Sequence, residues 1–326
     1  MNTIQLEQNW AKLINEGAFN FISNKINENC IPNLYLGINK KQNRCLLLFL
    51  PKNYKIKFVG DAKENLVTSY NKKENCIVLE LLDKYYFNLF NDLIISLYFK
   101  IYNIDEVNKS TSLFINTINK WAAFLANSRN NKLNEKTIRG LFGELTVLND
   151  MLQESSPSNV NNILKSWVGP YDANTDFVFD DKNIEVKTKN TASSVVRISS
   201  EFQLDNELGK KIHLLVVSIK TDNSYGENIE SIVNRIRKKI HSLGGDISIL
   251  FDALAQKSLF NHNLTEYNKH MYKLNKHDVF DCSLIIENNS TFPRLIKSEL
   301  PDFINKVKYN INLQELNKFI IDQKIF

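Results

Sequence analysis

The stretch from Ile212 to Ile219 constrains the fold more than any other part of the chain. It is apolar apart from His213 and Ser218. A strand that is apolar on both faces is buried on both faces, as in the middle of a covered sheet. The stretch therefore predicts a buried central strand.

An amphipathic helix is predicted after this strand, because apolar residues recur at helical spacing: Ile229, Ile232, Val233, Ile236, Ile240 and Leu243. Upstream, Asn134 could cap a helix that runs to Leu152. Short strand-like runs follow at Phe177–Phe179, Ile184–Val186 and Val195–Ile198. Strands and helices thus alternate from 130 to 245, which predicts an α/β core.

The segment before this core predicts a mixed α+β domain over residues 1–105. It has an amphipathic helical pattern over 5–29 and a second one over 87–101. Strands are predicted at the apolar runs Leu34–Ile38, Cys45–Leu50, Ile56–Val59 and Cys76–Leu81. After a polar linker over 103–110, a further helix carries the apolar residues Leu113, Phe114, Ile118, Trp121, Ala122 and Leu125.

The segment after the core, 246–326, predicts a small C-terminal part. It offers a helix near Ile247–Leu259, a strand at Cys282–Ile286 and a final helix from Leu313. The predicted domains are therefore 1–105, 106–245 and 246–326.

Composition excludes several classes of protein. The chain has 326 residues, of which 43% are hydrophobic and 24% charged, so wholesale disorder is excluded. The net charge of +5 permits a nucleic-acid partner without demanding one. The four cysteines have no CxxC spacing, which argues against a zinc ribbon and a disulfide framework. We expect reduced thiols and a cytoplasmic protein without a signal peptide or membrane span.

Three carboxylates and a lysine in the core region carry the candidate chemistry. Glu144 lies at the edge of the apolar face of the helix over 134–152, where a carboxylate is costly unless it is paired or bound to metal. Asp176 opens the run Phe177–Phe179. Glu185 and Lys187 are two apart on a strand, so both side chains point to one side. Gly140 and Gly143 in the same helix predict close approach to a neighbouring element.

Carboxylates that converge from a helix and two strands would bind a hard divalent cation such as Mg²⁺. A lysine beside them would orient or activate a water and offset negative charge on a phosphate. The spacing alone is weak evidence, because it recurs at Asp61-x-Lys63, Asp180-x-Lys182 and Asp322-x-Lys324. A surface ion pair on an edge strand is the alternative reading.

Four motifs together resemble the PD-(D/E)XK nuclease superfamily. They are Arg139-Gly140-Leu141-Phe142-Gly143-Glu144-Leu145, Trp167-x-Gly169-Pro170, Thr175-Asp176-Phe177 and Ile184-Glu185-Val186-Lys187-Thr188. More narrowly, the chain resembles a bacterial family of PD-(D/E)XK proteins known as DUF4420. Later stretches fit as well: Ile198-Ser199-Ser200 with Gln203-Leu204, Phe292-Pro293-Arg294 and Val307-Lys308-Tyr309.

The resemblance implies a restriction-endonuclease-like core, in which helices flank a mixed central sheet. It implies a nuclease dependent on Mg²⁺, for which Mn²⁺ could substitute, with Glu144, Asp176 and Glu185 as metal ligands and Lys187 as the residue that positions water. DNA is the implied substrate, and RNA is not excluded. Members of the family are similar to proteins near restriction and phage-defence genes, some with methylases or ATPases. Thr175 stands in place of the motif proline, which is commonly lost in the superfamily.

Further residues have both a functional and a structural interpretation. Asp172 could be the ligand in place of Asp176, although its neighbours are typical of a loop. Gln203 could contact the scissile phosphate or a water, or could cap a helix. Lys189 and Arg197 could touch the DNA backbone or simply be solvated.

The basic run Arg235, Arg237, Lys238 and Lys239 could be a phosphate track or an exposed helix face. The histidines lack zinc-hydrolase spacing, and no glycine-rich nucleotide loop is present. The leading hypothesis is a Mg²⁺-dependent DNA endonuclease, which could act as a homodimer. The alternatives are a non-catalytic DNA-binding or scaffold subunit, and a nuclease that is silent without an ATPase or methylase partner.

Overall fold

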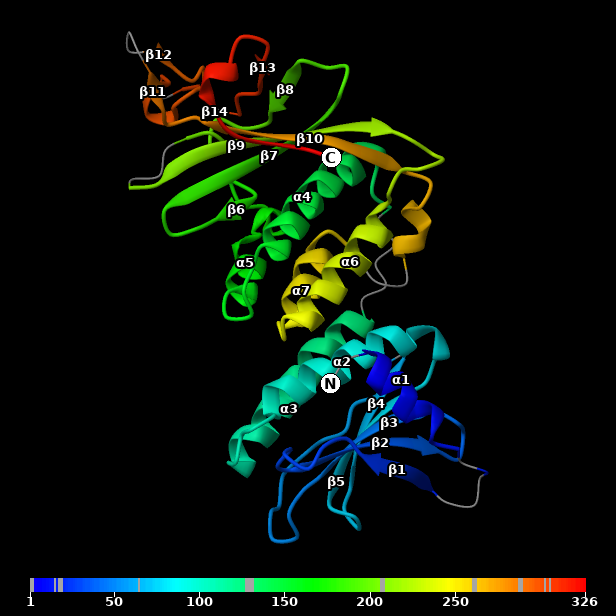
Figure 1. Cartoon of the computed structure of the whole chain (residues 1–326). Helices are drawn as coiled ribbons and strands as arrows, with labels where there is room; N and C mark the ends of the chain where they lie inside the picture. Colours follow the sequence, from blue (N-terminus) through cyan, green and yellow to red (C-terminus); the bar gives the residue numbers. More distant parts are fainter. Residues whose placement is uncertain are drawn as a thin grey trace. The chain divides into compact units, whose positions relative to one another are not determined.

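A computed structural model describes residues 3–14, 16, 20–63, 65–126, 132–205, 209–259, 263–286, 290–301, 303, 304 and 306–326. The chain forms two compact units. The first comprises residues 1–130, 246–252 and 260–262, and the second comprises 131–245, 253–259 and 263–326. Figure 1 shows both units.

The first unit contains a five-stranded antiparallel sheet in the order β1-β2-β3-β5-β4. Its elements are α1 (Thr3–Ala11), β1 (Phe21–Lys25), β2 (Asn33–Asn39), β3 (Arg44–Phe49), β4 (Leu66–Asn71), β5 (Cys76–Leu81), a short 3-10 helix (Lys84–Tyr86), α2 (Phe87–Ile101) and α3 (Val107–Ala126). The helices predicted from residues 87 and 113 are confirmed. The side chains of Ala122 and Leu125 lie outside the described residues.

Two predictions in the first unit are wrong, and one strand was missed. The helix predicted over 5–29 ends at Ala11, and Phe21–Lys25 forms β1 instead, because it pairs with β2 along the sheet. The run Ile56–Val59 forms no strand, and β4 was not predicted. The asparagines at 24, 27 and 29 also disfavour a continuous helix.

The second unit is built around a five-stranded mixed sheet in the order β14-β10-β9-β7-β6. Its helices and strands are α4 (Glu135–Gln153), α5 (Val160–Ser166), β6 (Phe177–Val178), β7 (Lys182–Asn190), β8 (Val195–Ile198), β9 (Lys211–Thr221), α6 (Ile229–Ser242), β10 (Tyr272–Asp281), β11 (Ile285–Ile286), β12 (Ser290–Thr291), β13 (Tyr309–Asn312) and β14 (Ile320–Ile325). Its described residues also form short 3-10 helices at Gly169–Tyr171, Leu264–Tyr267, Lys297–Glu299 and Asn317–Phe319. α7 (Ile247–Gln256) has residues in both units.

The predicted central strand is confirmed, because β9 is the middle strand of this sheet and Ile212–Ile219 is buried throughout. β9 is parallel to β7 and antiparallel to β10. Asn134 caps α4 as predicted, since its side chain accepts a hydrogen bond from the Thr137 amide at 3.0 Å. The chain is therefore a mixed α/β protein.

The two faces of the sheet are covered differently. On one face, alternate residues of β9 pack with the small β8–β13 sheet in a core made of Val196, Ile198, Leu204, Ile212, Leu214, Val216, Phe280, Cys282, Phe292, Ile311, Leu313, Leu316 and Phe319. On the other face lies α4, beside α6 (Figure 1). α4 approaches β7 so closely that a Cβ on Gly143 would lie 1.9 Å from Thr188 Oγ1. The predicted close approach is confirmed at Gly143 and wrong at Gly140, where a Cβ would meet nothing within 4 Å.

The C-terminal predictions need correction. The helix predicted from Leu313 is a 3-10 turn followed by β14, because Ile320–Ile325 pairs with β10 as an edge strand. The strand predicted at Cys282–Ile286 is confined to Ile285–Ile286, while the main strand, β10, precedes it. The helix predicted at Ile247–Leu259 is found as α7.

The compact units do not follow the predicted boundaries at 105 and 245. α3 lies with the first unit, where it packs on α2, and residues 263–326 lie with the second, where β10 and β14 complete the sheet. All four cysteines are free and buried. Among the described residues, no helix is long and apolar enough to cross a membrane.

Candidate functional site

The candidate site lies at the outer edge of β7. The neighbouring strand β6 is so short that it pairs only with Asn183 and Ile184. Beyond these residues, no described strand pairs with that edge of β7. In place of a neighbouring strand, the Asp176 carboxylate pairs with this edge: its Oδ2 accepts a hydrogen bond of 2.7 Å from the Val186 amide. Asp176 directly precedes β6, so the start of β6 determines where this carboxylate lies.

Glu144 reaches the same place from α4. Its Oε2 accepts a hydrogen bond of 2.9 Å from the indole nitrogen of Trp167, which is buried. Gly169 lies against both acids: a Cβ built there would be 2.6 Å from Asp176 Oδ1 and 2.9 Å from Glu144 Oε2. Oxygens of the two carboxylates are therefore both within 3 Å of one point.

Glu185 and Lys187 lie on one side of β7, as the sequence predicts. Lys187 Nζ is 2.5 Å from Glu185 Oε1 and donates to Gln203 Oε1 at 3.0 Å. Gln203 also accepts the Ser199 amide hydrogen at 2.7 Å, so its side chain is held between β7 and the end of β8. It lies in a turn over 201–204 rather than at the start of a helix. The other oxygen of Glu185, Oε2, is buried and accepts no hydrogen bond from the described part of the chain.

The three carboxylates are held in a site that disfavours their charged forms. Burial, followed by the charge of Asp176, raises the pKa of Glu144 to about 8. Burial also raises the pKa of Asp176, against the hydrogen bond from the Val186 amide. The pKa of Glu185 is raised by burial and by Asp176, against the charge of Lys187. Perturbed carboxylates gathered in a cavity are typical of functional sites.

These groups line one end of a cavity of about 590 Å³. The cations on its wall are Lys136, Arg139, Lys187, Lys189, Arg197 and Lys257. Lys136 and Arg139 are on α4, and Arg197 is on β8. Among the described residues, no carboxylate forms an ion pair with Lys136, Arg139 or Arg197. A wall of uncompensated cations beside a carboxylate cluster suits a polyanion with a phosphate at the cluster.

The donor set fits a hard divalent cation. Such ions prefer carboxylate oxygens, and Glu144, Asp176 and Glu185 supply them. No described residue donates a hydrogen bond to Glu185 Oε2. As the described side chains stand, however, no three Asp, Glu, His or Cys residues form a group that could hold a metal ion. Lys187, Trp167 and the Val186 amide occupy one oxygen of each acid instead.

The alternative ligand Asp172 lines the same cavity, but it is exposed. Its side chain is 89% exposed and forms an ion pair of 2.6 Å with Lys257. Lys189 donates a hydrogen bond of 2.7 Å to the Ser193 carbonyl. Its side chain is partly buried rather than freely solvated, and this burial lowers the pKa of Lys189. Arg197 is exposed on the cavity wall.

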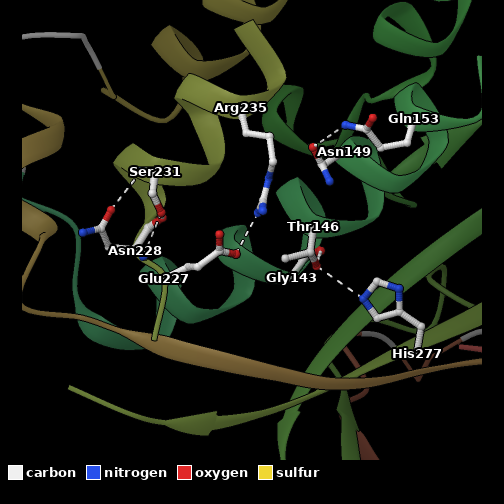
Figure 2. A network of polar contacts seen from close by, with 9 residues as sticks. All are labelled: Gly143, Thr146, Asn149, Gln153, Glu227, Asn228, Ser231, Arg235 and His277. Atoms are coloured by element: carbon white, nitrogen blue, oxygen red, sulfur yellow. Dashed lines mark hydrogen bonds and ion pairs between the residues drawn. The ribbon is translucent and has the colours of Figure 1, made fainter. Parts of the chain in front are cut away.

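Three of the four residues of the basic run on α6 have partners within the chain. Figure 2 shows Arg235 turned toward Glu227, with which it forms an ion pair of 2.7 Å. Arg237 donates to Asn234 at 3.0 Å, and Lys239 donates to the Gln153 carbonyl at 3.3 Å. None of these residues lines the cavity. The cations beside the carboxylates come from α4 and β8 instead.

The histidines also lie outside the cluster. His277 of β10 contacts Thr146 of α4 at 3.5 Å (Figure 2) and Asp150 at 3.2 Å, and so joins the sheet to the helix. His213 is buried beside Asp281, and burial lowers its pKa. His262 lies outside the described residues.

Sequence reasoning assigned no role to Trp167, Gly169 and Lys257. Trp167 and Gly169 occur in the motif Trp167-x-Gly169-Pro170, so the sequence marked them. It did not show that they contact Glu144 and Asp176. Lys257 had no signal, because it is remote in sequence from the motifs.

The structure defines a mixed α/β protein in which three carboxylates and a lysine line one cavity. The chain belongs to the DUF4420 family, described as "Putative PD-(D/E)XK family member", whose model matches residues 6–314. No curated protein and no solved structure matches the chain.

Proposed function

We propose that this chain is a Mg²⁺-dependent endonuclease that hydrolyses phosphodiester bonds in DNA, with Mn²⁺ as a substitute metal and a restriction-endonuclease-like core. One observation carries the proposal: Glu144, Asp176, Glu185 and Lys187 meet at one end of a cavity whose wall bears unpaired cations. Membership of the DUF4420 family, whose description is "Putative PD-(D/E)XK family member", supports the same reaction.

Each residue has a separate task in this proposal. Asp176, Glu185 and Glu144 would hold the cation, which lowers the pKa of a water and stabilises charge on a phosphate. The Lys187 ammonium, fixed between Glu185 and Gln203, orients the attacking water and offsets negative charge on the phosphate. Gln203 keeps Lys187 in place. Lys136, Arg139 and Arg197 hold the neighbouring phosphates of the strand.

Plasmid cleavage tests the proposal. Supercoiled plasmid is incubated with Mn²⁺ and with wild-type protein or Lys187→Met, which keeps the aliphatic stem and removes the charge. We expect nicked or linear DNA with wild type and a loss of about 100-fold or more in the variant. The matched control is Lys63→Met, because Lys63 forms the same D-x-K ion pair with Asp61, at 3.0 Å on the surface of the first unit. Equal cleavage by wild type and Lys187→Met contradicts the assignment.

A second candidate is a non-catalytic DNA-binding or scaffold subunit. The specific observation in its favour is that the described carboxylates do not already form a group that could hold a metal ion. The discriminating measurement is thermal stabilisation by Mn²⁺. A nuclease site gives a shift that disappears in Asp176→Asn and Glu185→Gln, whereas a scaffold gives no shift that depends on them.

The biological setting follows from the same proposal. A nuclease of this class would act in the cytoplasm in bacterial restriction or phage defence. An ATPase or methylase would be the partner that activates it or directs it to its target. If wild type binds Mn²⁺ at the carboxylates but leaves plasmid intact, the silent-nuclease form of the proposal predicts cleavage once such a partner is added.

Cleavage of both strands needs two sites or two events, and a homodimer supplies two. The exposed edge strand β14 offers a self-complementary surface. The Phe326 amide donates to the Asn275 carbonyl at 3.0 Å, so the alternation of an antiparallel ladder turns the backbone groups of Gln323 and Ile325 outward. Two copies paired about Gln323 would place Ile321 opposite Ile325 and Asp322 opposite Lys324.

A further inference from the structure

We infer that the turn Trp167–Gly169 is a positioning device that sets the Glu144 and Asp176 carboxylates at the spacing needed for one shared divalent cation. The inference rests on the proposed function, since it concerns the ligands of the proposed metal. Trp167 acts by a hydrogen bond, and Gly169 acts by leaving space. Neither residue would touch the phosphate.

Trp167 fixes Glu144. The indole is 1% exposed, and an isolated β-bridge joins Trp167 to Phe177, so the ring cannot readily reorient. Its N–H is a donor only and has one described acceptor, Glu144 Oε2 at 2.9 Å. One carboxylate oxygen is thereby held in place, and the other remains available to a cation. Partners that orient ligands in this way usually affect metal affinity strongly.

The same turn also holds Asp176. The amides of Val168 and Gly169 both donate to the Asp176 carbonyl, at 2.8 and 3.0 Å. The backbone of Asp176 is thus attached to the segment that carries the indole. One short turn therefore sets both carboxylates relative to each other.

Gly169 is required for space rather than for backbone conformation, because its φ is not positive. A Cβ at this position would lie 2.6 Å from Asp176 Oδ1, 2.9 Å from Glu144 Oε2 and 3.2 Å from Asp176 Cα. All three separations are shorter than ordinary van der Waals contact. The methyl group of an alanine would therefore collide with both carboxylates and displace at least one of them.

Gly140 provides a matched comparison. It lines the same cavity from α4, and a Cβ there would meet no heavy atom within 4 Å. A methyl group at 140 consequently leaves the carboxylates where they are. The pair Gly169→Ala and Gly140→Ala therefore isolates the effect of the space at Gly169.

Mn²⁺ binding to the full chain tests the inference without any need for activity. Free Mn²⁺ is measured by electron paramagnetic resonance with wild type, Gly169→Ala, Gly140→Ala, Trp167→Phe and Trp10→Phe. Trp10 is the control for Trp167, because its buried indole donates to the Asn91 side chain at 2.9 Å. We expect Kd to rise about 10- to 100-fold for Gly169→Ala and Trp167→Phe, and to stay within about twofold for both controls.

The outcomes separate this inference from the proposed function. If wild type binds Mn²⁺ and both test variants bind it equally well, the positioning role is wrong and the metal site stands. If wild type binds no Mn²⁺, the proposed metal site fails, and the inference fails with it.

If the variants do not fold, nuclear magnetic resonance of the wild-type protein provides the test, through the indole N–H signal of Trp167. It is identified by elimination with Trp10→Phe and Trp121→Phe, since the chain has three tryptophans. A resonance that shifts as Mg²⁺ is added supports the inference. One that stays fixed while Mg²⁺ binds overturns it.

Discussion

At the scale of single residues, Glu185 shows what the site costs. Its side chain is 2% exposed, and among the described residues its one ion-pair partner is Lys187 and its Oε2 has no hydrogen bond. A buried carboxylate that is only partly satisfied is destabilising relative to an apolar residue of similar size. A binding role for this oxygen explains why the chain keeps such a group.

The first prediction is a stability that falls as pH rises in metal-free protein. Burial raises the pKa of Glu144, Asp176 and Glu185, so the folded state keeps protons that the unfolded state loses above about pH 4.5. The folded state then binds more protons than the unfolded one, and stability decreases with pH between about 4.5 and 8. Thermal melts from pH 5 to 8.5 check this.

Two comparisons sharpen the pH experiment. Mg²⁺ should restore the melting temperature most at the upper end of the range, where the acids are ionised. Glu185→Gln should raise the midpoint of metal-free protein at pH 8 by several degrees and abolish the Mg²⁺ shift. Asp172→Asn, which changes an exposed carboxylate, should alter neither. A midpoint in wild type that rises steadily to pH 8 without metal contradicts this account.

At the scale of elements, α4 and β7 form the frame of the site, and the contact between them is made by Gly143. A Cβ there would lie 1.9 Å from Thr188 Oγ1 and 3.2 Å from Thr188 Cβ. Gly143→Ala should therefore destabilise the protein by about 1–3 kcal/mol, because the helix and strand must move apart. Gly140→Ala in the same helix should stabilise it by up to about 1 kcal/mol. Urea denaturation measures both; equal effects would show that α4 is not held against β7 at Gly143.

The cations of α4 make a second prediction at this scale. Lys136→Ala/Arg139→Ala should lower affinity for duplex DNA and reduce the slope of log K against log salt by about 2, since each cation neutralises one phosphate. The matched control is Arg235→Ala/Lys238→Ala on α6, where Arg235 is already paired with Glu227. Binding is measured with Ca²⁺ to prevent cleavage. A larger loss of DNA affinity in the α6 variant would contradict this prediction and would indicate that DNA binds along α6.

At the scale of the whole molecule, the exposed edge of β14 makes a prediction about assembly. Ile321 and Ile325 are 50% and 76% exposed there, and pairing with a second copy would cover them. In that arrangement the two Gln323 residues face each other at about 5.5 Å between Cα atoms, which a disulfide can span. Gln323→Cys should therefore form a covalent dimer under mild oxidation.

The control for cross-linking is Gln314→Cys, also exposed but away from β14. The four natural cysteines are buried, so each engineered thiol is the reactive one. Non-reducing gels and ultracentrifugation measure the products. Equal cross-linking of both variants, or a wild type that stays monomeric at high concentration, contradicts pairing through β14.

The sequence by itself determined the local elements of the core. The apolar run at Ile212–Ile219 and the helical stripe that becomes α6 depend only on the periods of strand and helix, which any window of residues displays. The cap at Asn134 is equally local. The shared side of Glu185 and Lys187 follows from strand geometry alone, and the structure joins them in an ion pair.

Only the tertiary structure decided the rest, because it depends on which distant segments meet. Ile320–Ile325 has a pattern that suits a helix or a strand, and pairing with β10 makes it a strand. The indole of Trp167 donates a hydrogen bond to Glu144, which is 23 positions away in the sequence, and Lys257 contacts Asp172, which is 85 positions away. No local period records such contacts. Local backbone geometry thus placed the elements, and long-range packing placed the groups that orient the site.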